Sequence, residues 1–164
     1  MSDPRAPEPA LDTADRELLL GWLAFHRDAL AAKCGGLTGE QLVTRSVPPS
    51  DLSLLGLARH LTEMERVYLH QALTGQPTSL LYCTDDDPDG DIASLDPAHA
   101  EADLARWQEE CAASDAALAG LALDDRVGSR TTVRWLVQKV IGEYARHNGH
   151  ADLIREAIDG QTGE

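Results

Sequence analysis

The sequence predicts an all-α protein, a four-helix bundle with one long crossover loop between its second and third helices. Apolar side chains recur at helical spacing in four long segments, and helix caps and breakers bound these segments. No segment shows the period-two alternation that is typical of strands. The length of 164 residues suits one domain with one core. We therefore expect residues 1–11 to form a disordered or surface-laid tail, and residues 12–160 to form a single bundle domain.

The first predicted helix covers about residues 14–33, with Asp12 or Thr13 as its cap. Cys34-Gly35-Gly36 ends it, because glycine adopts the left-handed conformation at low cost. Thr38-Gly-Glu-Gln41 is typical of a capping box, and it predicts a short helical turn. The apolar face of the first helix comprises Leu19, Trp22, Leu23, His26 and Leu30.

The second long helix begins shortly after Pro48-Pro49 and runs to about Leu73. Residues 75–95 then form the longest irregular segment, which is the predicted crossover loop. Asp96-Pro97 starts the third helix, about residues 97–121, because a capping carboxylate followed by proline is a helix start.

The fourth predicted helix, Thr132 to Ile158, carries three polar side chains on its apolar face. Burying a carboxylate and two imidazoles costs several kcal/mol unless something pairs with them, and a metal ion would satisfy them together. Glu143 and His147 lie one helical turn apart, so both can reach one ion. His60 lies on the apolar face of the second helix, so that helix also carries a polar group into the shared core. The face of the fourth helix comprises Leu136, Val140, Glu143, His147, His150, Ile154 and Ile158.

The charge balance excludes two classes of partner. Lysine and arginine number 14 and aspartate and glutamate 28, so the formal net charge is −14. This argues against a nucleic-acid binder, which needs a basic surface, and against an anionic membrane surface. No apolar run approaches the ~18 residues of a membrane span, and the start of the chain lacks the pattern of a signal peptide. Three widely spaced cysteines without a CxxC motif favour free thiols in a reducing cytoplasm.

Two motifs resemble a known family. EYARHNGH, which begins at Glu143, and ARHL, which contains His60, are similar to the DinB-like superfamily, closest to its uncharacterised actinobacterial branch and to mycothiol-dependent maleylpyruvate isomerases. The resemblance extends from the first helix to Gly160. It implies a DinB-type four-helix bundle with a divalent metal, usually zinc or nickel. It also implies that the ligands are a histidine of the second helix and two residues four apart on the fourth, which match His60, Glu143 and His147.

The resemblance also implies a thiol-dependent transferase or isomerase that acts on a small electrophile, with mycothiol as the cosubstrate. Zinc held by two histidines and a carboxylate keeps an open position, and zinc favours the thiolate form of a thiol. The protein then needs no catalytic cysteine of its own. His150 is a candidate hydrogen-bond partner of a ligand, a fourth ligand or an acid/base group, in that order. His26 either lines the cavity as an acid/base group or packs in the core.

Alternative interpretations remain open. One alternative is a non-catalytic metal-binding bundle that acts in stress response or sensing. Two histidines and a carboxylate also suit a non-haem iron oxygenase. In the simplest alternative, Glu143 and His147 pair with arginine or backbone groups and bind no metal.

The acidic segment at residues 85–91 formally resembles a calcium-binding EF-hand loop, with Asp96 in the twelfth position. Pro88 lies inside the segment, the twelfth residue is aspartate rather than glutamate, and no amphipathic helix leads into it. A solvated acidic cover near the mouth of the bundle is the favoured interpretation.

The aromatic residues bear on packing and assembly. Trp135 is assigned to ordinary core packing, and Tyr144 to the surface or a salt bridge. More aromatic side chains occur than one core can hold, so we expect a homodimer. The three side chains that lead to this expectation are Trp22, Phe25 and Tyr68.

Overall fold

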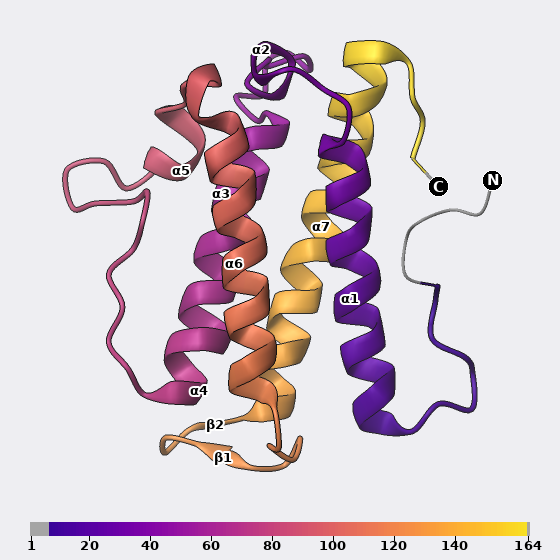
Figure 1. The fold of residues 1–164 in the computed structure, drawn as a ribbon, viewed down its shortest axis with the longest axis vertical. Coiled ribbons are helices and arrows are strands. Elements are labelled where there is room, and N and C mark those ends of the chain that lie inside the picture. The colour runs from indigo at the N-terminus through magenta and orange to yellow at the C-terminus, as the bar shows by residue number, and fades with distance from the viewer. Residues whose placement is uncertain (1–6, 164) are drawn as a thin grey trace.

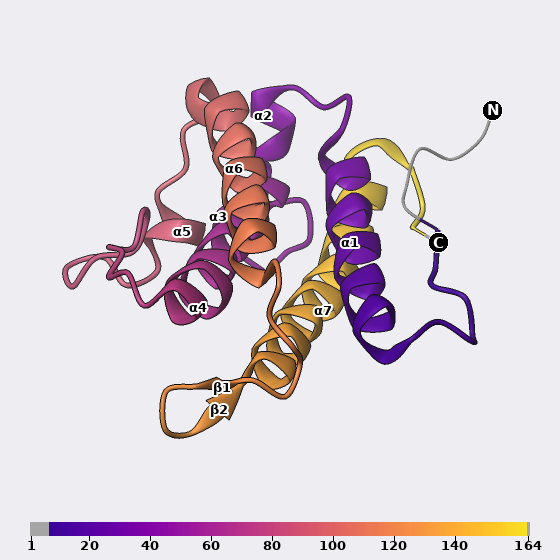
Figure 2. The same cartoon turned by 60° about the horizontal axis from the view of Figure 1, so that its bottom comes forward.

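The computed structural model describes residues 7–163, and its long helices form two packed pairs (Figures 1 and 2). Helix α1 (Asp15–Cys34) packs along α7 (Val133–Asp159), and α3 (Leu54–Met64) packs against α6 (Ala100–Leu118). Helix α3 also contacts α7, which joins the two pairs. The prediction of a mostly helical protein is therefore confirmed.

Side-chain caps set the starts of α2 (Gly39–Leu42), α3 and α7. The predicted cap of α1 at Asp12 or Thr13 is wrong, because Ala14 precedes that helix and its side chain offers no cap. The Thr132 hydroxyl accepts a hydrogen bond from the Trp135 N–H at the start of α7, and Ser53 caps α3 in the same way. The capping box of Thr38 and Gln41 is present in both directions and opens α2. Because these caps satisfy N–H groups that lack a partner within the helix, they fix the start of each segment along the chain.

The second long helix differs from its prediction in its backbone. Helix α3 continues into a π-helix, η1 (Glu65–Gln71), and then into α4 (Ala72–Thr74), which ends at Gly75 with φ +69°. The apolar pattern gives no sign of the wider turn, since π-segments are rare and keep nearly helical spacing. The first residue of the π-helix, Glu65, is fully buried.

The crossover loop, residues 75–95, is fixed to one face of α3. The Arg59 guanidinium donates to the Ser94 carbonyl at 2.7 Å and to the Gly90 carbonyl at 2.8 Å, at α5 (Gly90–Ala93). The buried Glu63 carboxylate accepts hydrogen bonds from the backbone N–H groups of residues 81 and 82, each at 2.7 Å. The loop then enters α6 through a short 3₁₀ turn, η2 (Pro97–His99).

A small hairpin corrects the expectation that the chain has no strand. Strands β1 (Arg126–Val127) and β2 (Thr131–Thr132) pair antiparallel, with Arg126 opposite Thr132. Gly128, at φ +61°, lies in the turn between them. Each strand has only two residues, too few for an alternating pattern to show in the sequence.

The predicted tail is described only in part, because residues 1–6 lie outside the described residues. Pro9 packs against Gly21 of α1, where a Cβ atom would come within 2.7 Å of the proline ring. None of the helices in residues 7–163 is long and apolar enough to cross a membrane. The core between the helix pairs includes Leu23, Leu30, Leu57, Leu61, Val137, Val140 and Ile154.

Candidate metal centre

Three side chains from two helices converge as the sequence predicts. His60 of α3 meets Glu143 and His147 of α7, and one ligand atom from each lies within 4.8 Å of the other two. The two imidazole rings have a centroid separation of 4.8 Å. Within the part of the chain that the structure describes, no other group of three or more histidine, cysteine or acidic side chains converges in this way.

A carboxylate from the crossover loop orients His60. Its Nδ1 lies 2.8 Å from the Asp91 carboxylate, which is only 5% exposed. Burial alone raises the pKa of Asp91, but hydrogen bonds from His60 and Cys83 outweigh it and lower the pKa. An ionised Asp91 accepts the Nδ1 proton and leaves the Nε2 lone pair of His60 for a metal, the arrangement by which carboxylates commonly orient histidine ligands.

His147 is held in the neutral form. Burial lowers its pKa to about 4, and the neighbouring His60 and His150 act in the same direction. A neutral imidazole has the lone pair that metal binding requires. The Nδ1 atoms of His147 and His150 lie 3.3 Å apart, and His147 Nε2 lies 3.5 Å from the Glu143 carboxylate. When Nδ1 of His147 donates to His150, its Nε2 keeps the lone pair, and this atom faces the Glu143 carboxylate.

Glu143 is ionised and buried beside two cations. Burial alone raises its pKa, but a hydrogen bond and charge attraction from Lys139, together with the charge of Arg146, lower it below the ordinary value. Lys139 bonds one carboxylate oxygen, and Arg146 lies 3.8 Å from the other. The interpretation that Glu143 pairs with basic residues is thus partly realised, yet its second oxygen still faces His147.

The donor set fits a divalent metal. Two neutral imidazoles and one carboxylate are the ligands of many zinc sites with an open position. Each of the three side chains also has one neighbour outside the group: Asp91 contacts His60, His150 contacts His147 and Lys139 contacts Glu143.

Comparison with known proteins identifies the family of the chain. A family model described as mycothiol-S-transferase matches residues 18–160. This chain belongs to the mycothiol-S-transferase family. The family is part of the DinB-like superfamily, so the resemblance seen in the two motifs is confirmed. Searches of curated proteins and of solved structures found no match. Membership indicates a mycothiol-dependent, transferase-like function.

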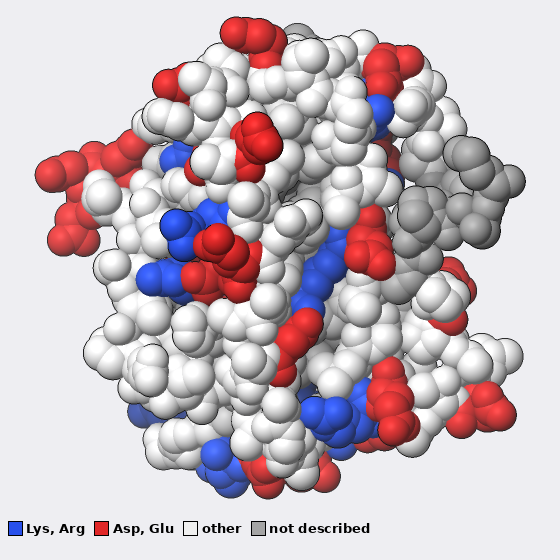
Figure 3. Space-filling model, viewed as in Figure 1, with Lys and Arg blue, Asp and Glu red and all other residues white. Residues whose placement is uncertain are grey.

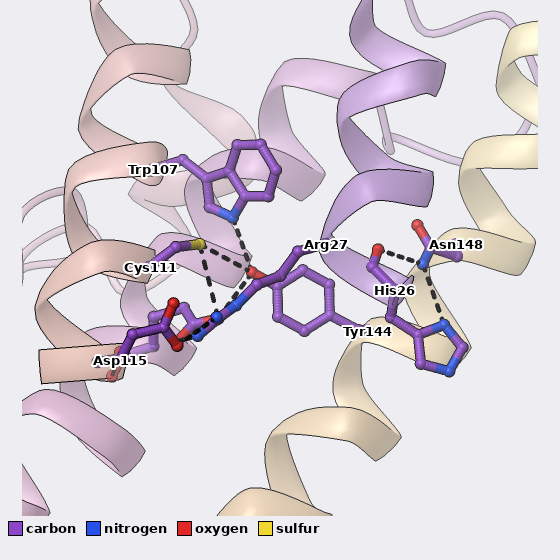
Figure 4. A network of polar contacts seen from close by, with 9 residues as sticks. His26, Arg27, Trp107, Cys111, Asp115, Tyr144 and Asn148 are labelled. Atoms are coloured by element: carbon purple, nitrogen blue, oxygen red, sulfur yellow. Dashed lines mark hydrogen bonds and ion pairs between the residues drawn. The ribbon is translucent and has the colours of Figure 1, made fainter. Parts of the chain in front are cut away.

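His26, the second candidate acid/base residue of this mycothiol-S-transferase family member, contacts a different part of α7. Its Nδ1 lies 3.4 Å from the Asn148 amide nitrogen, which also donates to the His26 carbonyl at 2.9 Å (Figure 4). Its ring also packs beside Trp22 and Phe25. Asn148 follows His147 directly but points toward α1, so the structure does not bring His26 together with the three converging side chains in any described contact.

The acidic segment does not gather into a calcium-type site. Asp91 turns inward to His60, and the Asp87 carboxylate accepts a hydrogen bond from Ser94 at 2.8 Å. The carboxylates of residues 85–91 form no group with converging ligand atoms in the described chain. Asp91, which the sequence placed in an acidic cover, instead contacts His60 of the candidate site.

The protein has no activated thiol of its own. Burial raises the pKa of Cys34 and of Cys111 to about 12, and it also raises the pKa of Cys83. The nucleophilic form of a cysteine is the thiolate, so these side chains stay in the unreactive form at neutral pH. All three are free cysteines, as predicted.

A second polar cluster, which was not predicted, surrounds Tyr144, the residue that follows Glu143 on α7. The buried Glu65 carboxylate receives the Arg27 guanidinium in a two-bond ion pair at 2.7 and 2.8 Å, and the Tyr144 hydroxyl at 2.9 Å. Trp107 Nε1 donates to the Tyr144 oxygen at 2.7 Å (Figure 4). Tyr144 is fully buried, so its expected place at the surface was wrong.

This buried network forms the floor of a cleft between α1 and α6, visible in Figure 3. The cleft has a volume of about 330 Å³, and Arg27 reaches across it to Asp115 at 2.7 Å. Because each charged group in the network has a described partner, the network links the helices without leaving a ligand position.

Proposed function

We propose that this protein is a metal-dependent S-transferase in which His60, Glu143 and His147 hold one divalent ion. The convergence of the three ligand atoms within 4.8 Å is the observation that carries the proposal. Zinc is the first candidate, because a borderline metal suits imidazole and carboxylate ligands and needs no further protein donor. Nickel and iron suit the same donor types.

When bound, the metal supplies a position at which a thiol loses its proton near neutral pH. The residues of the chain hold and complement that position. Asp91 keeps His60 oriented, and Lys139 and Arg146 keep Glu143 ionised. The S–H bond of the external thiol breaks and its proton goes to a neighbouring base. The thiolate sulfur then forms a bond to the electrophilic carbon, and the leaving group departs with the electron pair of the bond that breaks. Raised pKa values exclude Cys34, Cys83 and Cys111 as the attacking groups.

His150 is the proposed proton acceptor for the thiol. It lies beside His147, with the two Nδ1 atoms 3.3 Å apart, and its own ring is half-buried. An imidazole accepts a thiol proton only at a ring nitrogen with a free lone pair, so His150 takes this role when its Nδ1 is not the acceptor of the His147 hydrogen bond. The roles of His150 and His26 in the reaction both stay predictions.

The finer features of the fold and assembly belong to the same proposal. We propose a DinB-type four-helix bundle over residues 12–160, with mycothiol as the thiol and a small electrophile as the second substrate. The homodimer and the cytoplasmic location remain predictions from the sequence. Light scattering at micromolar concentration tests the dimer, and a monomer there contradicts it.

A transfer assay tests the reaction. The metal-free protein, the zinc-loaded protein and a variant with Cys34, Cys83 and Cys111 changed to serine are each mixed with mycothiol and a panel of electrophiles. Transfer should require zinc and mycothiol together and should survive in the cysteine-free variant. If folded, zinc-loaded protein gives no rate above that of mycothiol alone, the non-catalytic metal-binding bundle becomes the better interpretation.

Single ligand variants test the metal centre independently of activity. His60→Ala, Glu143→Ala and His147→Ala should each lower zinc affinity more than 100-fold, because each removes one of three protein ligands. His150→Ala should lower it less. Competition with a zinc-binding dye measures all four. Wild-type protein that binds no divalent metal under any loading condition refutes the assignment.

A further inference from the structure

A partly exposed strip of two aromatic side chains and one lysine leads away from the converging side chains. Along α7, Trp135, Lys139 and Glu143 lie one helical turn apart, so they share one face. Lys139 bonds the Glu143 carboxylate, and Trp135 is 54% exposed. The backbone positions of Trp135 and Glu143 are thus about 12 Å apart along the helix, at about 1.5 Å per residue.

Tyr68 of η1 completes the strip from the facing helix. Its ring centroid lies 6.5 Å from that of Trp135, and the Lys139 ammonium lies 5.5 Å from the Tyr68 ring. Tyr68 follows His60 by eight residues along the α3–η1 segment, as Trp135 precedes Glu143 by eight along α7. Both helices therefore connect the ligand cluster to the same aromatic pair.

Core packing does not account for Trp135. Burial of aromatic rings is a major source of stability, and Trp22 and Trp107 are half-buried or buried. Trp135 is the only tryptophan that the described chain leaves exposed. Its expected place in the core was wrong. Its exposure two helical turns before Glu143 calls for another explanation.

We propose that Tyr68, Lys139 and Trp135 form the subsite for the sugar portion of the thiol. This inference rests on the proposed function and specifies how its thiol is recognised. A sugar presents C–H faces that pack on aromatic rings and hydroxyl groups that form hydrogen bonds. Tyrosine and tryptophan combine an apolar ring with a polar edge, which matches that surface. An ammonium group has three donors, so Lys139 can bond Glu143 and a sugar hydroxyl together.

The length and charge of the strip agree with this ligand. A thiol that reaches from the metal ligands to Trp135 must extend over about 12 Å, further than cysteine alone reaches. The acidic protein, with a net charge of −14, does not repel an uncharged sugar as it would repel an anionic tail. The subsite therefore selects a sugar-linked thiol over short or acidic thiols.

Kinetic measurements separate this subsite from the ligand cluster. The Michaelis constant for mycothiol is compared with that for N-acetylcysteine, a thiol without the sugar, in wild type, Trp135→Ala and Tyr68→Leu. Each variant should raise the mycothiol constant about tenfold relative to the N-acetylcysteine constant, the scale of one lost ring contact. Leu153→Ala is the matched control, because Leu153 is an exposed apolar residue of the same helix about 27 Å further along.

Binding to the metal-free protein gives a second measurement that needs no activity. The S-methyl derivative of mycothiol keeps the sugar but has no thiol proton. Calorimetry should show it binding to wild type and about tenfold more weakly to Trp135→Ala. If the variants bind it as wild type does, the subsite is refuted while the S-transferase proposal stands. If transfer fails but this difference persists, the reaction is refuted and the subsite stands.

Discussion

Glu143 and Tyr144 are neighbours on α7, yet they belong to polar clusters of opposite character. Tyr144 lies in a network in which donors and acceptors alternate: Trp107 donates to it, and it donates to Glu65. Glu143 lies with His60 and His147, and one potential ligand atom of each lies within 4.8 Å of the other two. Both clusters are buried in the same helical protein, so burial alone does not distinguish a structural network from a binding site.

The distinction lies in the kind of group that meets at the centre of each cluster. Arg27 supplies the positive charge for Glu65, and the network needs nothing further. Burial alone lowers the pKa of Arg27, but the ion pair with Glu65 raises it above the ordinary value. In the other cluster Lys139 and Arg146 also lie beside the Glu143 carboxylate, but two imidazoles and this carboxylate bring one potential ligand atom each within 4.8 Å of the others. A convergence of potential ligand atoms from two helices is thus the more informative signal for function.

The largest expected effect comes from removing the Arg27–Glu65 ion pair in the cluster around Tyr144, which we call the closed network. Arg27→Leu leaves the fully buried Glu65 without its cation, and it should lower the free energy of unfolding by about 3–5 kcal/mol. Urea denaturation measures this change. Asp115→Asn is the control, because its side chain is exposed and should cost less than about 1 kcal/mol. Equal losses in the two variants would mean that the network contributes no more than a surface pair.

Acid should affect the two clusters differently. His147 has a folded pKa of about 4 against about 6.5 in an unfolded chain. Between these values the unfolded chain binds more protons, so stability is lost as pH falls from 6.5 toward 4. The full loss is about 3 kcal/mol for the metal-free protein. In the closed network, burial and Glu65 raise the pKa of Tyr144, so its hydroxyl does not titrate in this range.

Denaturation of metal-free wild type and of His147→Gln at pH 7 and pH 4 measures the acid effect. The variant lacks the titrating imidazole, so it should lose less stability on acidification than wild type, by up to about 3 kcal/mol. Identical losses would show that other groups account for the acid sensitivity.

The sequence predicted helices and the convergence well because both depend on local spacing. Caps such as Thr38 and Thr132 act within one turn, and Glu143 and His147 share a face through the helical repeat. His60 was predicted from its place on the apolar face of the second helix and from the ARHL motif. Whether these residues bind metal stays a prediction, since spacing establishes proximity and not occupancy.

The unpredicted parts depend on how separate segments pack. Arg27 lies between the buried Leu23 and Leu30 on α1, a charged residue on an apolar face, and Glu65 occupies a similar place in its helix. This signal was available, but their pairing depends on the rotation of two helices about their axes. Asp91 gave no signal of its role, because an irregular loop has no period from which its inward direction can be inferred.

The smallest expected effect tests whether the crossover loop contributes to metal binding by His60, Glu143 and His147. Asp91→Ala removes the carboxylate that holds His60 Nδ1 at 2.8 Å, and it should lower zinc affinity about 10–100-fold. The loss is smaller than for a ligand variant because His60 keeps its own nitrogen. Asp86→Ala is the matched control, since it removes an exposed carboxylate from the same loop and should leave affinity nearly unchanged.

The two variants separate orientation from charge. Both remove one negative charge from the same loop, so a general electrostatic effect would lower zinc affinity in both and would weaken with added salt. An orienting effect is confined to Asp91→Ala and persists at high salt, because a buried hydrogen bond is screened little. Asp91→Asn should lie between wild type and Asp91→Ala, since its amide oxygen still accepts the Nδ1 proton but carries no charge. Equal zinc affinity in Asp86→Ala and Asp91→Ala would show that the loop carboxylate acts only through charge, and the two histidines would then be oriented by helix packing alone.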